Sequence, residues 1–163
     1  MATKVNDVRA VLVHSARAEA VEDGSAAIEA EHVLLALTEL TGTTTARLLA
    51  EAGLTRETVR AALDREWEES LSVAGVTVAV AELPKATPDR SRNPKIGETT
   101  KLLLKRATDC ASATGGGRIG AAHLLAGALN TTHGRIPRAL HLAGVDREAL
   151  LTQATAAAAR QDH

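Results

Sequence analysis

The chain has 163 residues, of which 45% are apolar, and its 19 basic and 20 acidic side chains leave a formal net charge of −1. With one Trp and no Phe or Tyr, it lacks both the basic surface and the aromatic stacking platforms expected of a nucleic-acid-binding protein. Helix-forming residues dominate and runs of β-branched residues are rare, so we predict an all-α fold with a core of Ala, Val and Leu.

Membrane partners and a disulfide framework are also not expected. No apolar run approaches the roughly 18 residues of a membrane span, and the first residues lack an apolar signal region. The single cysteine, Cys110, cannot form an internal disulfide, which agrees with a reducing compartment. We therefore expect a cytoplasmic protein in which Cys110 is a small apolar helix residue.

The first half of the chain carries the pattern of four helices. Apolar residues at three- or four-residue spacing predict a first helix over residues 6–22 and a second that begins near Ala30. A third helix is expected over residues 44–52, closed by a glycine. The fourth begins at Thr55, whose hydroxyl can cap the first free amides of the helix.

Residues 67–95 form a connector of different composition. Valines alternate with smaller residues at its start, which is typical of extended chain, and three prolines then exclude a helix. We predict a short extended piece on the surface, followed by a linker; the residues behind this prediction are Val76, Val78, Val80, Pro84, Pro88 and Pro94.

The second half of the chain repeats the first. Residues 28–37 read Ile-Glu-Ala-Glu-His-Val-Leu-Leu-Ala-Leu, and residues 119–128 read Ile-Gly-Ala-Ala-His-Leu-Leu-Ala-Gly-Ala, with the histidines 123 − 32 = 91 positions apart. The same offset, without a gap, pairs Leu12 with Leu103, Ala16 with Ala107, Ala20 with Ala111, Gly24 with Gly115 and Arg47 with Arg138. We therefore predict a pseudo-twofold duplication of a four-helix unit, about eight helices in all.

The predicted boundaries are repeat 1 at residues 1–66, the connector at 67–95 and repeat 2 at 96–163, with the two repeats packed as one domain. In repeat 2, Asp146 takes the capping position of Thr55, and Leu150 follows where an apolar residue can pack against the residue before the cap.

These two stretches resemble the Clp N-terminal (repeat) domain, which heads the ClpA and ClpC unfoldases and also occurs as short free-standing actinobacterial proteins. The family pattern at the second helix is Ile-Gly-Thr-Glu-His-Ile-Leu-Leu-Gly-Leu. Repeat 1 keeps Ile28, Glu31, His32, Leu34 and Leu35, and repeat 2 keeps Ile119, Gly120, His123, Leu125 and Gly127.

The resemblance implies a non-enzymatic protein-binding module that docks client proteins, or a Clp unfoldase or adaptor, in Clp-dependent quality control. It places the candidate client-binding positions at Val5, Asn6, Glu31 and Ile96. In some ClpC relatives, the glutamate and a threonine recognise phosphorylated arginine. Here Ala122 replaces the second glutamate, and Asn6 and Gly97 replace the threonines, so a complete phosphoarginine pocket is not expected.

Two other function classes remain open. The module could sequester a small molecule, such as a Clp-directed peptide antibiotic, and so shield the unfoldase, although Val5 and Ile96 replace the aromatic residues on which such binding rests in the family. An enzyme built on the histidines is the third hypothesis. His32 and His123 occupy equivalent positions in separate repeats and lack metal-ligand spacing, so we predict structural roles for them and no catalytic, cofactor or metal site.

Overall fold

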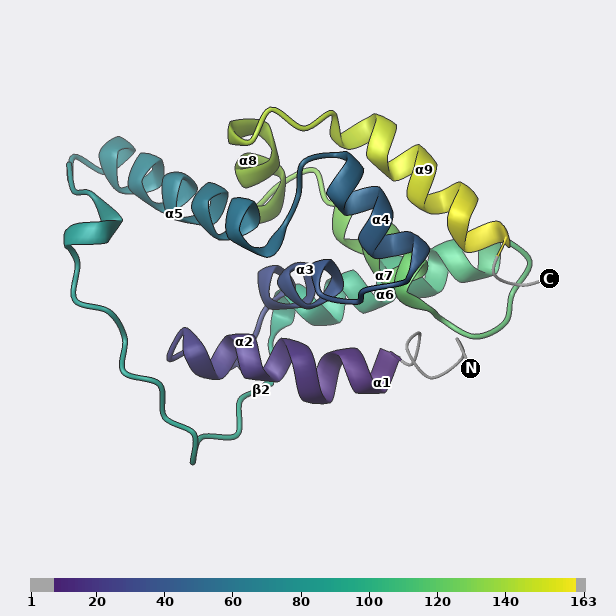
Figure 1. The fold of residues 1–163 in the computed structure, drawn as a ribbon, viewed down its shortest axis with the longest axis horizontal. Helices are drawn as coiled ribbons and strands as arrows, with labels where there is room; N and C mark the ends of the chain where they lie inside the picture. The colour runs from purple at the N-terminus through teal and green to yellow at the C-terminus, as the bar shows by residue number, and fades with distance from the viewer. Residues whose placement is uncertain (1–7, 161–163) are drawn as a thin grey trace.

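Two sets of helices, in the same order, make up this computed structural model, which describes residues 8–160 (Figure 1). In the first set, α1, η2 and α2 follow one another without a break, and η2 is a π-helical stretch. The first set is α1 (Val8–Ala10), η2 (Val11–Ala16), α2 (Arg17–Glu22), α3 (Ala30–Thr38), α4 (Thr44–Glu51) and α5 (Arg56–Val73). The second set is α6 (Glu98–Ala113), α7 (Ala121–Leu129), α8 (Arg135–Leu142) and α9 (Arg147–Arg160).

The helix starts follow the offset seen in the sequence. The first residues of α3 and α7, α4 and α8, and α5 and α9 are each 91 positions apart (121 − 30, 135 − 44 and 147 − 56). The predicted all-α duplication is therefore confirmed, with the uninterrupted run α1–η2–α2 in the place that α6 takes in the second set.

The predicted capping residues begin the last helix of each set. The Thr55 hydroxyl accepts a hydrogen bond from the Thr58 amide at 3.3 Å, and the Asp146 carboxylate accepts one from the Ala149 amide at 3.1 Å. Leu150 is buried in the position predicted for it. Each helix thus begins where a side-chain oxygen replaces the missing backbone acceptor.

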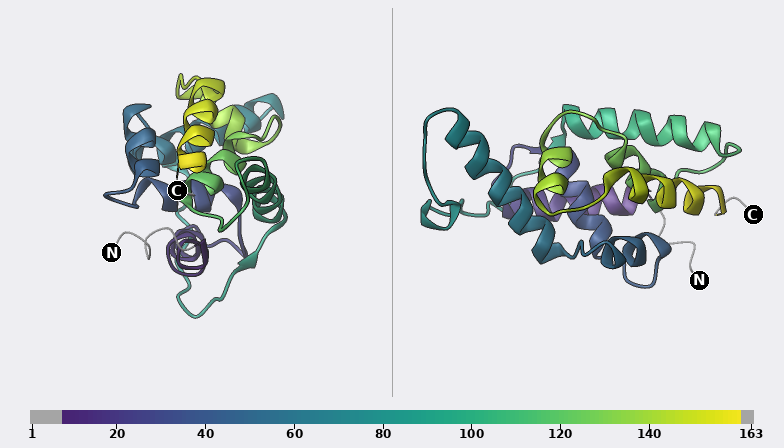
Figure 2. Two further views of the ribbon diagram at one scale, coloured as in Figure 1. Left: turned by 90° about the vertical axis from the view of Figure 1, so that its right-hand side faces the viewer. Right: turned by 90° about the horizontal axis from the view of Figure 1, so that it is seen from above.

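The core is continuous across the two repeats. All of α7 is buried and α3 is buried from His32 to Leu37, and α3 and α7 contact each other. Helices α6 and α4 lie on opposite sides of α9 in the view from above (Figure 2). Helices α6 and α7 approach each other closely at Gly127, where a Cβ atom would lie 2.6 Å from the carbonyl oxygen of Leu103 on α6.

The connector is extended, as predicted, and it runs from the far end of α5 back to the bundle (Figure 1). Helix α5 itself continues past residue 66 to Val73. In the described chain, the alternating valines do not form a strand. The Glu68 carboxylate accepts a hydrogen bond from the Val80 amide at 2.7 Å, and a 3₁₀ turn, η3 (Val80–Glu82), begins at Val80. The division of the chain at residue 66 stays a prediction.

Within residues 8–160, none of the helices has the length and apolar character that crossing a membrane requires.

Candidate functional site

The two repeats meet at a short parallel strand pair. Strand β1 (Ala27–Ile28) precedes α3, strand β2 (Lys95–Ile96) precedes α6, and Ile28 lies opposite Ile96 in the register. The Ile28 carbonyl accepts hydrogen bonds from the Gly97 amide at 2.9 Å and from the buried Thr100 hydroxyl at 2.7 Å. We call residues 27–31 and 95–100 the junction site.

At the junction site, α3 and α6 cap each other. The Thr99 hydroxyl accepts a hydrogen bond from the Ala30 amide at 2.9 Å and donates one to the Glu29 carboxylate. The same carboxylate accepts a hydrogen bond from the Thr99 amide, at 3.3 Å, in the first turn of α6. A carboxylate is favourable at the N-terminus of a helix, so Glu29 of repeat 1 stabilises the first helix of repeat 2.

Glu31 forms an ion pair that joins the repeats. Its side chain is 12% exposed, and its carboxylate lies 2.9 Å from a guanidinium nitrogen of Arg135 on α8. Arg135 also pairs with the buried Glu66 on α5 at 3.2 Å, and Arg138 pairs with Glu66 at 2.8 Å. Burial raises the pKa of Glu66, but hydrogen bonds from Ser70 and Arg138, with the charges of both arginines, hold it below its ordinary value.

The four predicted client-binding positions divide into two groups. Val5 and Asn6 lie outside the described residues. Ile96 is 38% exposed and lies beside repeat 1, within the same junction site as Glu31. The structure therefore places Ile96 of repeat 2 opposite Ile28 of repeat 1, a pairing that the sequence pattern did not predict.

Glu29 and Thr99 are members of the junction site that the sequence pattern did not predict, and neither did it predict Arg135 as the partner of Glu31. For Glu29 a signal existed, because the family pattern has glycine at that position. No sequence signal links Arg135 to Glu31, because they are 104 positions apart and meet only after the repeats have packed.

The two repeated histidines have structural roles. His32 and His123 are 2% and 1% exposed, and their Nδ1 atoms accept hydrogen bonds from the amides of Glu29 and Gly120 at 2.9 and 3.0 Å. With Nδ1 as acceptor, Nε2 of His32 carries the proton and donates to Asp23 at 2.9 Å. Each histidine thus caps the helix that contains it, and His32 also binds the residue that follows α2.

Among residues 8–160, no three His, Cys, Asp or Glu side chains lie close enough together to hold a metal ion. Burial raises the pKa of the Cys110 thiol, which disfavours the reactive thiolate.

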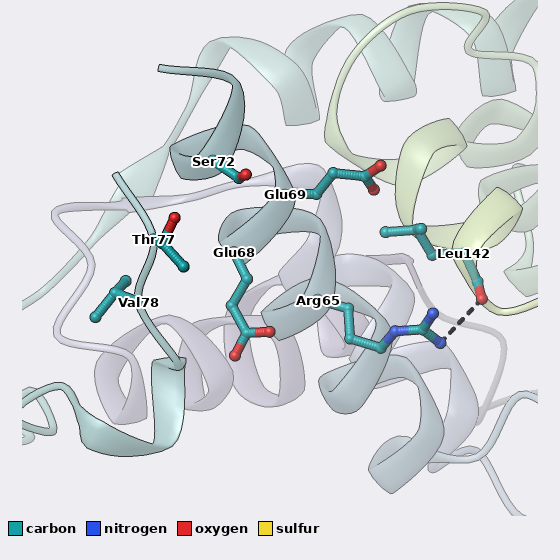
Figure 3. Close-up of a pocket in the computed structure, with 7 residues that line it drawn as sticks. All are labelled: Arg65, Glu68, Glu69, Ser72, Thr77, Val78 and Leu142. Carbon is teal, nitrogen blue, oxygen red and sulfur yellow. Dashed lines mark hydrogen bonds between the residues drawn. The ribbon is translucent and has the colours of Figure 1, made fainter. Parts of the chain in front are cut away.

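Two grooves flank the outer half of α5. One, of about 430 Å³, lies between α5 and the connector, and the other, of about 440 Å³, lies between α5 and α8. Glu69 and Leu142 line both grooves, and Figure 3 shows Thr77 and Val78 of the connector across α5 from Leu142 (Figure 3).

The fold and the junction site describe an all-α module made of two repeats. The repeats cap each other, and an aliphatic side chain, Ile96, is exposed where they meet. The family model of the Clp repeat (R) N-terminal domain matches residues 5–92 and 95–163. The chain therefore belongs to the Clp N-terminal domain family and is a Clp-related protein-binding module.

Among solved structures, the chain is similar to the N-terminal domain of the caseinolytic protease associated chaperone ClpD from Arabidopsis thaliana. The match has a TM-score of 0.67 and 18% sequence identity, and it covers 100% of this chain and 98% of that one. This likeness supports the fold. The search of curated proteins found no match.

The junction site departs from the family pattern at two facing positions. Where the pattern has glycine, this chain has Glu29, and where relatives have threonine, it has Gly97. The two changes fit each other, because a Cβ atom at Gly97 would lie 2.3 Å from a carboxylate oxygen of Glu29. A carboxylate thus occupies the space that a side chain at position 97 would fill.

Proposed function

We propose that this protein is a non-enzymatic docking module that binds a segment of a client protein, a Clp unfoldase or an adaptor at the junction site. The observation that carries the proposal is the exposed Ile96, placed on strand β2, which within residues 8–160 pairs with β1 along one edge and has no strand along the other. A strand with an open edge can accept an extended segment by backbone hydrogen bonding, and an aliphatic side chain beside it supplies apolar contact.

The charges at the junction site favour a segment without a phosphate group. Glu29 places a negative charge beside Gly97, which has no hydroxyl to donate to a phosphate, and the Glu31 carboxylate is held by Arg135. Like charges in close contact are unfavourable. We therefore expect the module to bind unmodified segments in preference to segments that contain phosphorylated arginine.

The test is a pull-down from lysate of the source cell, with and without ATP, in which the natural chain and three variants serve as bait. Ile96→Asp places a charge on the exposed apolar position and should abolish capture of Clp subunits or of a defined client set. Glu31→Ala should reduce capture, because it removes a carboxylate from the junction site and leaves Arg135 paired with Glu66 alone. Glu51→Ala, on the exposed end of α4, is the matched control.

Capture that is identical with all three variants would contradict binding at the junction site. Capture of nothing by the natural chain would contradict the docking function, and it would favour the second candidate, sequestration of a peptide-like small molecule. A ligand screen read by the shift in melting temperature of the purified protein would then test that candidate directly.

A further inference from the structure

The outer half of α5 carries exposed apolar side chains that the fold does not use. Figure 1 shows this half of the helix, at the end nearest the connector, extending away from the other helices. Three of the six large hydrophobic residues that are exposed in residues 8–160 lie on it or just after it: Trp67 at 45%, Val73 at 88% and Val76 at 49%. Such a concentration on one projecting element is typical of an interaction surface.

Of these three residues, Val73 lines the groove between α5 and α8. Val73, Pro137 and Leu142 supply apolar atoms along it, and Glu69 lies where it meets the groove on the connector side. Arg65 fixes the end of α8, because its guanidinium donates a hydrogen bond to the Leu142 carbonyl at 3.1 Å (Figure 3). The groove wall is therefore built from two helices that are tied together.

One carboxylate that lines the groove has no partner in the described residues. The Glu66 carboxylate is paired with Arg135 and Arg138, whereas Arg65, which borders the neighbouring groove, donates a hydrogen bond to the Leu142 carbonyl. Glu69 is exposed, and within residues 8–160 its carboxylate forms neither a hydrogen bond nor an ion pair.

We propose that this groove, called the α5–α8 groove below, is a second docking surface, and that its occupant is a segment of a partner protein with a lysine or arginine between aliphatic residues. The aliphatic side chains pack on Val73, Pro137 and Leu142, and the cation pairs with Glu69. The proposal does not depend on the junction site, because the two surfaces share no residue.

The experiment uses a labelled peptide, acetyl-Gly-Ser-Leu-Lys-Leu-Gly-Ser-amide, and two matched peptides, one with Glu in place of Lys and one with Ser in place of both Leu. Binding is measured by fluorescence anisotropy. Trp67 is the only tryptophan of the chain and follows Glu66, which lines the groove, so its emission is a second signal to record during the titration. We expect the Leu-Lys-Leu peptide to bind about tenfold more tightly than either matched peptide.

The variant Glu69→Lys should reverse the charge preference, so that the Glu peptide binds more tightly than the Lys peptide. Glu51→Lys makes the same charge change at the exposed end of α4 and should leave both affinities unchanged. Circular dichroism of the variants establishes that both retain their helices.

Three results would overturn the proposal. The first is that the Leu-Lys-Leu peptide does not bind, and the second is that Glu69→Lys still prefers the Lys peptide to the Glu peptide. The third is that Glu51→Lys changes the affinity for the two peptides as much as Glu69→Lys does. A dimer detected by light scattering that dissociates in Glu69→Lys would also overturn it, because the occupant would then be a second copy. The junction-site variant Ile96→Asp should bind the peptide normally, so failure at one surface does not imply failure at the other.

Discussion

At the scale of single residues, Thr45 on α4 is the clearest imperfection of the core. It is fully buried, and its hydroxyl is the only buried side-chain polar atom in residues 8–160 without a hydrogen-bond partner. Repeat 2 has Ile136 at the equivalent position. Val carries a methyl group where Thr carries the hydroxyl and has nearly the same shape. We therefore predict that Thr45→Val raises the free energy of unfolding, measured in urea, by about 1 kcal/mol.

The matched control is Thr100, which is also fully buried but donates a hydrogen bond to the Ile28 carbonyl. Thr100→Val should lower the free energy of unfolding by about 1 kcal/mol or more, since it removes that hydrogen bond from the junction site. A loss of stability in both variants would mean that the Thr45 hydroxyl is satisfied in solution.

Local helix caps could be predicted from the sequence, whereas contacts between the repeats could not. Thr55 and Asp146 cap as expected, because a cap depends on residues three positions away. The Glu29–Thr99 and Glu31–Arg135 contacts span 70 and 104 positions, and no local pattern determines them. Two of the four predicted client-binding positions, Glu31 and Ile96, lie in the junction site. Ile96 lies there because β2 of repeat 2 pairs with β1 of repeat 1.

At the scale of helices, α6 and α7 leave no room for a side chain at Gly127. A Cβ atom at Gly127 would lie 2.6 Å from the Leu103 carbonyl oxygen and 3.0 Å from the Ala107 nitrogen, and both are backbone atoms that cannot move alone. We predict that Gly127→Ala lowers the free energy of unfolding by about 1–3 kcal/mol, as overpacking does. The better helix propensity of Ala would offset only about 1 kcal/mol.

The equivalent position in repeat 1 is Ala36, which is buried in α3. Ala36→Gly is therefore the complementary variant; it should be destabilised through lost helix propensity and a small cavity, with no relief of any close contact. An increase in stability for Gly127→Ala would show that α6 can move away from α7 without cost.

The pairing of α2 with α5 predicts a loss of stability in acid. Glu19 is 8% exposed and accepts hydrogen bonds from Arg56 at 2.7 Å and from Arg60 at 2.5 Å. Burial raises the pKa of Glu19, but these two arginines hold it below its ordinary value; Asp23, bound by His32 and Arg60, is lowered against burial in the same way.

A lowered carboxylate pKa contributes stability that is complete above the pKa of the unfolded chain and is lost as the pH falls through the folded value. We therefore expect the free energy of unfolding to decline below about pH 4.3. Glu19→Gln should be less stable at pH 7 by about 1–3 kcal/mol and should lose less on acidification. Urea titrations over this pH range, with Glu51→Gln as control, measure both effects.

At the scale of the molecule, the repeats share one core and one set of bridging contacts. Buried residues of both repeats form a single hydrophobic cluster, in which α3 contacts α7 and α4 contacts α9. The reciprocal caps at the junction site and the Glu31–Arg135–Glu66 cluster also cross between the repeats. Separation of the repeats would expose apolar surface and leave buried carboxylates without partners, so neither repeat is expected to be stable alone.

We therefore predict that residues 8–160 unfold as one cooperative unit. Hydrogen exchange in low concentrations of urea should give α3 and α7 the same opening free energy, because both lie at the centre of the shared core. Arg135→Ala, which removes a cation from Glu31 and from Glu66, should lower both values together by about 1–3 kcal/mol, a range reduced because Arg135 is 35% exposed. If α7 kept its protection while α3 exchanged freely, the repeats would be independent units, and the bridging contacts would contribute to docking geometry instead of stability.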